Sequence, residues 1–171
     1  MTRPAVEGDL RAVSAGALAY VGDAVYELHA RLRTFGNGRD PSGAMHRRAV
    51  RIVKASTQAE AARRLLPELT EEEAAIYRRG RNNTSGSMPK HADPVAYRAA
   101  TGLEAVIGFL YLRGEETRVE ELMEKICAIS DELERHPAQP ERSSGPEDGG
   151  EESDAPYEPE SSAPFVGSLM G

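Results

Sequence analysis

The sequence has few of the residues that build disulfides, zinc sites or membrane spans. Among 171 residues Cys127 is the only cysteine, which excludes an intrachain disulfide and a cysteine zinc cluster. The most apolar stretch, residues 103–112, has about half the length that a membrane helix needs. The first ten residues contain Glu7 and Asp9 and no apolar run, unlike a signal peptide. We therefore expect a soluble, cytoplasmic protein with no membrane attachment.

Negative charge is concentrated at one end of the chain, whose formal net charge is −7. Residues 136–171 contain eight acidic residues and one arginine, whereas residues 1–135 contain 20 acidic and 20 basic residues. The C-terminal segment is rich in Pro, Glu, Ser and Gly, so it cannot bury enough apolar surface to offset its ordering entropy. We predict one folded domain over residues 1–135 and a disordered acidic tail over residues 136–171. The acidity of the tail says little about the partners of the domain.

Apolar residues in the domain recur at helical spacing, and the alternating β-branched runs that are typical of strands are scarce. Thr70 with Glu73 and Thr117 with Glu120 have the spacing of capping boxes, which mark helix starts. Asp93 followed by Pro94 is another helix start, and Gly114 is a helix stop. The pattern predicts an all-α fold without a sheet. Five principal helices are predicted over residues 14–33, 42–66, 70–79, 93–113 and 117–133.

The first predicted helix carries an acid in an unusual place. Its predicted core stripe consists of Leu18, Val21, Val25, Leu28 and Leu32. Asp23 projects almost directly opposite this stripe, with Glu27 one turn further on. Small residues (Gly16, Ala19 and Ala30) occupy the face that a surface helix usually fills with charges. They permit close approach of another group, and an acid among them needs a counter-charge. A solvated carboxylate beside a helix-packing seam is the alternative.

Glu104 is a second isolated acid, the only charged residue within residues 103–112. An unpaired buried carboxylate costs several kcal/mol, so Glu104 needs a partner, and Arg98 is one candidate. Two lone acids on two otherwise apolar helices suggest instead that they meet around a cation. Ligation by oxygen alone favours a hard ion, Mg²⁺ or Mn²⁺.

Basic residues gather in the second predicted helix and in the polar segment around residues 78–98. Clusters of this kind are typical of contact with a phosphate backbone, although a solvated face is the more usual reason for them. No aromatic stacking pattern accompanies them, which favours duplex RNA over single strands. The RNA-binding candidates are Arg47, Arg48, Arg51, Lys54, Arg78, Arg79, Arg81, Ser85 and Lys90.

Two motifs in these helices resemble the ribonuclease III family. Residues 17–28 (ALAYVGDAVYEL) resemble its signature segment, and residues 102–114 (GLEAVIGFLYLRG) resemble its second metal-binding helix. Residues 78–98 are similar to the Mini-ribonuclease III branch, which has the nuclease domain without a double-stranded-RNA-binding domain. The resemblance implies a magnesium-dependent endoribonuclease that cuts double-stranded RNA. In that reading Asp23 and Glu104 are the catalytic, metal-binding acids.

The same resemblance implies a homodimer and a role in maturing the precursor of large-subunit (23S) ribosomal RNA. The expected chemistry is metal-assisted hydrolysis that leaves a 5′-phosphate, and Glu27 is a candidate for orienting a metal-bound water. The family's longer members have further acids where this chain has Gly16, Ala19 and Thr101. This difference keeps open a catalytically inert module of the same fold that binds structured RNA or the ribosome. A protein–protein adaptor that works through the acidic tail is a more distant alternative.

Overall fold

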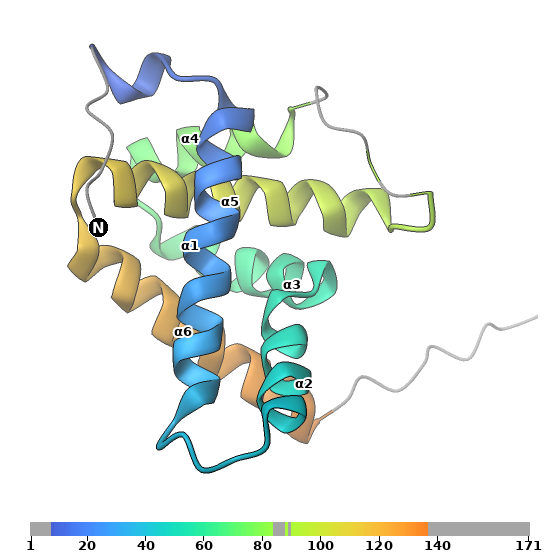
Figure 1. The fold of residues 1–171 in the computed structure, drawn as a ribbon. Coiled ribbons are helices and arrows are strands. Elements are labelled where there is room, and N and C mark those ends of the chain that lie inside the picture. The colour runs from blue at the N-terminus through green and yellow to red at the C-terminus, as the bar shows by residue number, and fades with distance from the viewer. Residues whose placement is uncertain (1–7, 84–87, 89, 137–171) are drawn as a thin grey trace, which may run out of the picture. The chain divides into compact units, whose positions relative to one another are not determined.

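A computed structural model describes residues 8–83, 88 and 90–136, and these residues form six α-helices and no strand (Figure 1). The helices are α1 (Ala15–Phe35), α2 (Ser42–Val53), α3 (Ala55–Leu65), α4 (Glu71–Arg81), α5 (Pro94–Arg113) and α6 (Glu116–Arg135). Short 3-10 turns precede α1 (Leu10–Ala12) and α4 (Leu66–Glu68). The predicted all-α class is confirmed. The predicted tail, apart from His136, lies outside the described residues.

Helix α5 forms the centre of the core and contacts α1, α3, α4 and α6. Its residues from Ala105 to Leu110 are all buried, and Figure 1 shows α1 crossing over it. Among the described helices it is the one that is long and apolar enough to cross a membrane by length and composition alone. However, 56% of its most apolar window is buried inside the structure, which is the burial expected of a helix at the centre of a helical domain.

Helices α1 and α5 cross with their main chains in contact, at two glycines. A Cβ atom on Gly22 would lie 1.7 Å from the carbonyl oxygen of Glu104, and one on Gly108 would lie 2.0 Å from the carbonyl oxygen of Leu18. Only glycine fits at either position, because any side chain would force the helices apart. The close approach that the small residues of α1 predicted is confirmed, and the approaching group is α5.

This crossing corrects the predicted core stripe of α1. Leu18 and Val25 are buried as expected, but Leu28 is 48% exposed and Leu32 is 62% exposed. The buried face is instead the one that carries the small residues, including Ala19, Gly22 and Ala30. The physical reason is distance: small residues let α1 approach α5 closely, whereas a seam of leucines would keep the helices further apart.

The predicted helix over residues 42–66 is wrong, because Lys54 breaks it into α2 and α3. Lys54 is extended, with φ −64° and ψ 142°. Two carbonyl oxygens that a continuous helix would satisfy accept hydrogen bonds from side chains. The Tyr26 hydroxyl donates to the Ile52 oxygen at 3.2 Å, and the Gln58 amide donates to the Val53 oxygen at 3.0 Å. Tertiary hydrogen bonds therefore replace helical ones at this kink.

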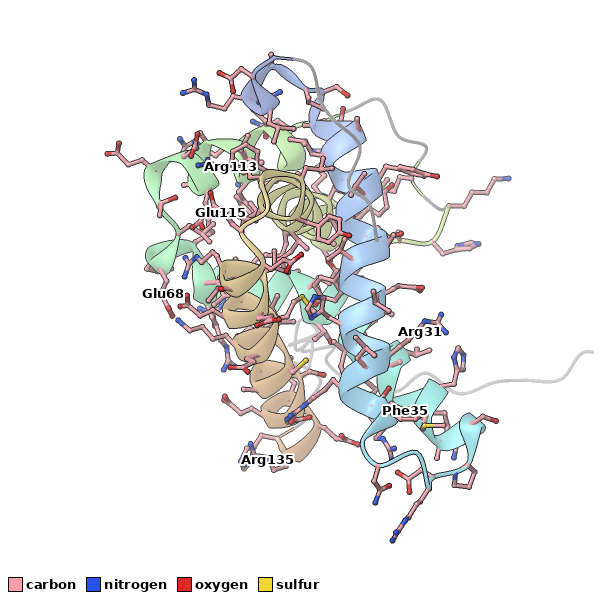
Figure 2. The ribbon with its side chains drawn as sticks, turned by 60° about the vertical axis from the view of Figure 1, so that its left-hand side comes forward. Arg31, Phe35, Glu68, Arg113, Glu115 and Arg135 are labelled. Atoms are coloured by element: carbon pink, nitrogen blue, oxygen red, sulfur yellow. The ribbon has the colours of Figure 1, made fainter. Side chains whose placement is uncertain are left out.

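Most of the predicted helix ends are confirmed. Thr70 and Glu73 form the capping box of α4, Asp93 caps α5, and Gly114 ends α5 in the left-handed conformation with φ 84°. The predicted capping box of Thr117 with Glu120 is wrong, since α6 already begins at Glu116. The cap position is Glu115, whose side chain makes no capping hydrogen bond. Its amide donates back to the Leu110 carbonyl, and its side chain pairs with Arg113 at 2.9 Å (Figure 2).

A buried ion pair joins α4 to α6. Glu73 is only 3% exposed, and its two carboxylate oxygens accept hydrogen bonds from Arg118 at 2.9 and 3.0 Å. The Thr70 amide also donates to Glu73, at 2.8 Å. Burial acts to raise the pKa of Glu73, but the hydrogen bonds from Arg118 and Thr70 outweigh it and hold this pKa below its usual value.

Candidate active site

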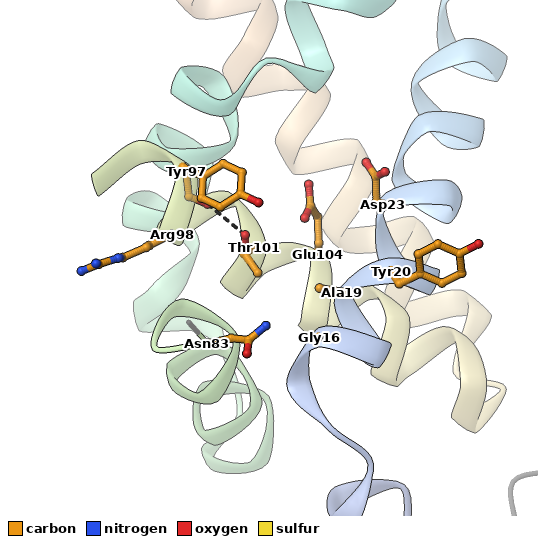
Figure 3. A pocket seen from close by; sticks show the side chains of 9 residues that line it. All are labelled: Gly16, Ala19, Tyr20, Asp23, Asn83, Tyr97, Arg98, Thr101 and Glu104. Atoms are coloured by element: carbon orange, nitrogen blue, oxygen red, sulfur yellow. Dashed lines mark hydrogen bonds between the residues drawn. The ribbon is translucent and has the colours of Figure 1, made fainter. Parts of the chain in front are cut away.

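Asp23 and Glu104, the two isolated acids, line the same pocket, which has a volume of about 560 Å³ (Figure 3). Asp23 comes from α1 and Glu104 from α5, and both carboxylates project to the same side of the crossing. The pocket is lined by Gly16, Ala19, Tyr20, Asp23, Asn83, Tyr97, Arg98, Thr101 and Glu104. The structure therefore brings together the two residues that the sequence singled out.

The main-chain contact between α1 and α5 places the acids. Gly22, the residue before Asp23, lies against the carbonyl group of Glu104 itself. The spacing of the two acids is thus determined by backbone packing. Asp23 is exposed at the rim of the pocket, and partial burial, together with the charge of Glu27, raises the pKa of its carboxyl.

Glu104 is partly buried and holds one hydrogen bond, from the Gln58 amide to its Oε1 at 3.1 Å. Burial raises the pKa of Glu104 to about 7; the Gln58 hydrogen bond opposes this shift, and the charge of Asp23 adds to it. The ion pair between Glu104 and Arg98, which the sequence left as an alternative, is not formed, although Arg98 lines the same pocket. Within the described part of the chain, neither acid has a cationic side chain as ion-pair partner.

The chemistry of the pocket suits a divalent cation. Two carboxylates converge there, and neither is paired with a cation among the described residues. A bound cation would favour the ionised form of Glu104. No group of three or more His, Cys, Asp or Glu residues gathers among the described residues, so the protein offers few ligands. Mg²⁺ commonly binds to one or two carboxylates and keeps water at its other coordination positions, which fits this pocket.

Two residues named from the sequence, Arg98 and Thr101, line the pocket, whereas Tyr97 was not singled out. Tyr97 precedes Thr101 by four residues and Thr101 precedes Glu104 by three, so helical spacing counted back from Glu104 could have identified it. The Thr101 hydroxyl donates to the Tyr97 carbonyl at 3.1 Å, which keeps it along the helix (Figure 3). Asn83, which follows α4, also lines the pocket but has no such signal. The same holds for Gln58 on α3, which does not line the pocket but donates to Glu104, because only the tertiary fold brings these residues to the site.

Three of the predicted RNA-binding arginines are engaged within the protein. Arg48 pairs with Asp40 at 2.5 Å, and Arg51 pairs with Glu134 at 3.0 Å. The Arg79 guanidinium donates to the carbonyl oxygens of Arg11 and Val13, at 2.6 and 2.7 Å. Arg79 thereby holds the segment before α1 against α4, and we assign it a structural role.

The other predicted basic candidates remain exposed. Within the described ranges Arg47, Lys54, Arg78, Arg81 and Lys90 are exposed and take part in no ion pair. Ser85 lies outside the described residues. Glu27 pairs with Arg31 at 3.2 Å and does not line the pocket, so its predicted contribution to the site would have to act at a distance. The functional roles of all these residues stay predictions.

Comparison with known proteins identifies the class to which this helical fold, with its pocket lined by two acids, belongs. Residues 16–115 match the family model of the ribonuclease III domain, so the chain belongs to the ribonuclease III family and is an endoribonuclease. More particularly, it is 44% identical to Mini-ribonuclease 3 of Symbiobacterium thermophilum over 118 residues, 69% of this chain and 88% of that protein. It is 43% identical to Mini-ribonuclease 3 of a Thermoanaerobacter species over 115 residues, 67% of this chain and 81% of the relative.

A solved structure agrees with this assignment. The crystal structure of a protein from Fusobacterium nucleatum superposes with a TM-score of 0.64 at 27% sequence identity. The match covers 69% of this chain and 96% of the other. The resemblance drawn from the two sequence motifs is thus confirmed, and so is the expectation of an endoribonuclease.

Proposed function

We propose that the protein cuts double-stranded RNA with a divalent metal ion, Mg²⁺ or alternatively Mn²⁺, held by Asp23 and Glu104. The observation that carries this proposal is the pocket itself, where two carboxylates converge and neither forms an ion pair within the described part of the protein. Ionised Glu104 beside Asp23 is unfavourable unless positive charge is supplied from outside. A bound cation would remove that cost and hold both acids in the charged form.

The bound metal ion, the two acids and Arg98 would each contribute differently to the reaction. The ion, when bound, would activate water and stabilise charge on the leaving oxygen, which leaves a 5′-phosphate. Asp23 and Glu104 would hold it at one place, because the contact of Gly22 with the Glu104 carbonyl fixes their spacing. Arg98 lines the same pocket, where its charge would favour a phosphodiester next to the acids.

We propose a ribosomal RNA precursor, that of the large subunit, as the natural duplex. Support comes from the membership in the ribonuclease III family and from the exposed cations (Arg47, Lys54, Arg78, Arg81 and Lys90), which suit a phosphate backbone. Work in the cytoplasm, away from membranes, is part of the same proposal. Its support is the single cysteine, Cys127, which is a free, buried thiol.

We also propose a homodimer, which the family resemblance implies. The small face of α1 and the apolar residues around Glu104 pack against each other within one domain, so they are not free to form an interface. Exposed apolar residues instead lie on the outer side of α1: Leu28 is 48% exposed and Leu32 62%. A two-fold pair would cover such a surface and would present two identical sites, one for each RNA strand.

The cleavage proposal is tested by incubating duplex RNA with the purified protein and Mg²⁺, with and without EDTA. We expect cleavage that EDTA abolishes and added Mg²⁺ restores, with 5′-phosphate on the new ends. RNA that is bound but remains intact in Mg²⁺ and in Mn²⁺ would identify an inert binding module. Sequencing of ribosomal RNA ends in a strain that lacks the gene tests the substrate.

The dimer is tested by sedimentation at micromolar concentration. We expect a dimer for the wild type and a monomer for Leu32→Glu, with unchanged helical circular dichroism. Glu71→Gln, at the exposed start of α4 and away from Leu32, is the control for an exposed substitution. A monomeric wild type that still cuts both strands in one binding event would exclude the arrangement.

A further inference from the structure

We infer that Gln58 is a positioning residue for the active site, which fixes the carboxylate of Glu104 in the orientation that a divalent cation requires. Gln58 lies on α3, is only 3% exposed and does not line the pocket. It reaches the site through a single contact, the hydrogen bond from its Nε2 to Glu104 Oε1 at 3.1 Å. This inference rests on the proposed metal site.

The orientation of the Gln58 amide is determined by its two neighbours. One Nε2 hydrogen is directed to Glu104, and Nε2 also donates to the Val53 carbonyl oxygen at 3.0 Å. Both neighbours are acceptors. Turning the amide over would place its oxygen against a carbonyl and a carboxylate at once, so the nitrogen must face them. Gln58 is thereby committed to donating to Glu104.

The other end of the same amide is left without a partner. Gln58 Oε1 is buried and accepts no hydrogen bond from any residue that the structure describes. A buried polar atom without a partner is unfavourable, and an apolar residue of the same length would avoid it. A glutamine at this position is therefore poorly explained by packing alone. It is explained if its N–H groups are needed where they are.

The hydrogen bond to the Val53 carbonyl holds the Gln58 side-chain amide in place. Val53 is the last residue of α2, and the kink at Lys54 leaves its carbonyl without a helical hydrogen-bond donor. Gln58 thus braces Glu104 against the α2–α3 kink, while Tyr26 holds the preceding carbonyl, that of Ile52, at 3.2 Å. The two side chains bind neighbouring carbonyls of one kink, but only Gln58 also touches Glu104.

This difference supplies a matched pair of variants. Gln58→Met keeps the length of the side chain and removes the donor together with the unpaired acceptor. Tyr26→Phe removes a hydrogen bond to the same kink and leaves the contact with Glu104 in place. Binding of Mn²⁺ to the full-length protein without RNA is followed by electron paramagnetic resonance of free Mn²⁺. Circular dichroism confirms that each variant is folded, and Gln58→Leu is the second choice if Gln58→Met is not.

We expect Gln58→Met to weaken Mn²⁺ binding by about ten-fold to a hundred-fold, the usual effect of removing a residue that orients a metal ligand. Tyr26→Phe should bind Mn²⁺ as the wild type does. Cleavage by Gln58→Met should lose kcat at low Mn²⁺, keep its KM for RNA, and recover at high Mn²⁺.

Equal Mn²⁺ binding by Gln58→Met and wild type would overturn the inference and leave the metal site standing. Equal losses in Gln58→Met and Tyr26→Phe would also overturn it, because the kink alone would then explain the effect. A wild-type protein that binds no Mn²⁺ would overturn the proposed metal site together with this inference.

Discussion

Glu73 and Glu104 are two carboxylates in the interior of one small domain, and their surroundings are opposite. Glu73 receives hydrogen bonds from Arg118 and from the Thr70 amide, and its pKa is held below the usual value despite burial. Glu104 receives one neutral hydrogen bond, from Gln58, and burial raises its pKa to about 7. One acid is neutralised by the protein, and the other is not.

Under the proposed function, this difference separates a structural acid, Glu73, from a metal-binding one, Glu104. A buried charge is tolerated when its partner folds with it, as Arg118 does for Glu73. A buried carboxyl that faces another acid, Asp23, gains nothing for the fold, and its cost persists until a cation arrives from solution. The comparison therefore predicts which substitutions affect activity and which affect stability.

The largest effect is expected for removal of the charge on either active-site acid. Asp23→Asn and Glu104→Gln should each reduce cleavage by at least about a hundred-fold, since a direct ligand matters more than the residues that orient it. Helical content and binding of duplex RNA should be retained. Cleavage rates in Mg²⁺ and gel-shift assays measure both properties, with Glu124→Gln as an exposed control on α6. Near wild-type rates in either variant would contradict the assignment of the metal site.

Removal of the partner of the structural acid should have the opposite profile. Arg118→Met leaves Glu73 buried without a cation and should lower the free energy of unfolding by about 3 kcal/mol at pH 7. Because the folded-state pKa of Glu73 is lowered, its stabilisation is present above the usual pKa and is lost as pH falls, so the deficit should shrink in acid. Urea unfolding measures it, and Arg63→Met, in an exposed pair with Glu60, should cost far less. Cleavage by the folded fraction should be unchanged.

A smaller, stabilising effect is expected for Glu104→Gln when metal is removed with EDTA. The folded-state pKa of Glu104 is raised from 4.5 to about 7, so its charge destabilises the fold increasingly between these values and fully above them. The variant should therefore exceed the wild type in unfolding free energy by about 1 to 3 kcal/mol at pH 8 and match it at pH 4. Equal stability of the two proteins at pH 8 would show that Glu104 carries no such cost.

The smallest effect concerns a third group of acids, the eight within residues 136–171. Deletion of residues 137–171 should preserve cleavage, because these acids add nothing to a surface that binds phosphates. RNA binding should tighten modestly at low salt, where the tail repels RNA, and the difference should vanish at high salt. Binding titrations at two salt concentrations measure this difference. If the truncated protein does not fold, the predicted boundary of the domain is wrong.

Local patterns were sufficient to predict much of the fold and the centre of the site. The capping box at Thr70 and the helix limits at Asp93 and Gly114 depend on residues close in sequence, and they are confirmed. Asp23 and Glu104 could be recognised because a lone acid in an apolar helix is costly wherever that helix packs. Because two such acids occur on two apolar helices, the sequence also predicted that they meet around a cation.

The remaining features depend on contacts between distant segments. Lys54 has nothing in its neighbourhood that marks a helix break; the break is held by Tyr26 from α1 and by Gln58. Leu28 and Leu32 have the spacing of a core stripe, yet the glycine contact with α5 turns them outward. Gln58 is one polar residue on an amphipathic helix, and no spacing relates it to Glu104, 46 positions away.

The contact of Gly22 with the Glu104 carbonyl has a consequence for how this enzyme can vary. Because main-chain atoms set the distance between the two acids, exchange of core side chains elsewhere leaves that distance unchanged. Mutations in α6, or in α2 and α3 away from Gln58 and the kink at Lys54, can then accumulate, or be introduced to raise the melting temperature, without changing the site. A methyl group at Gly22 would do the reverse: it would move Asp23 and Glu104, the proposed metal-binding acids, apart even if the rest of the core remained well packed.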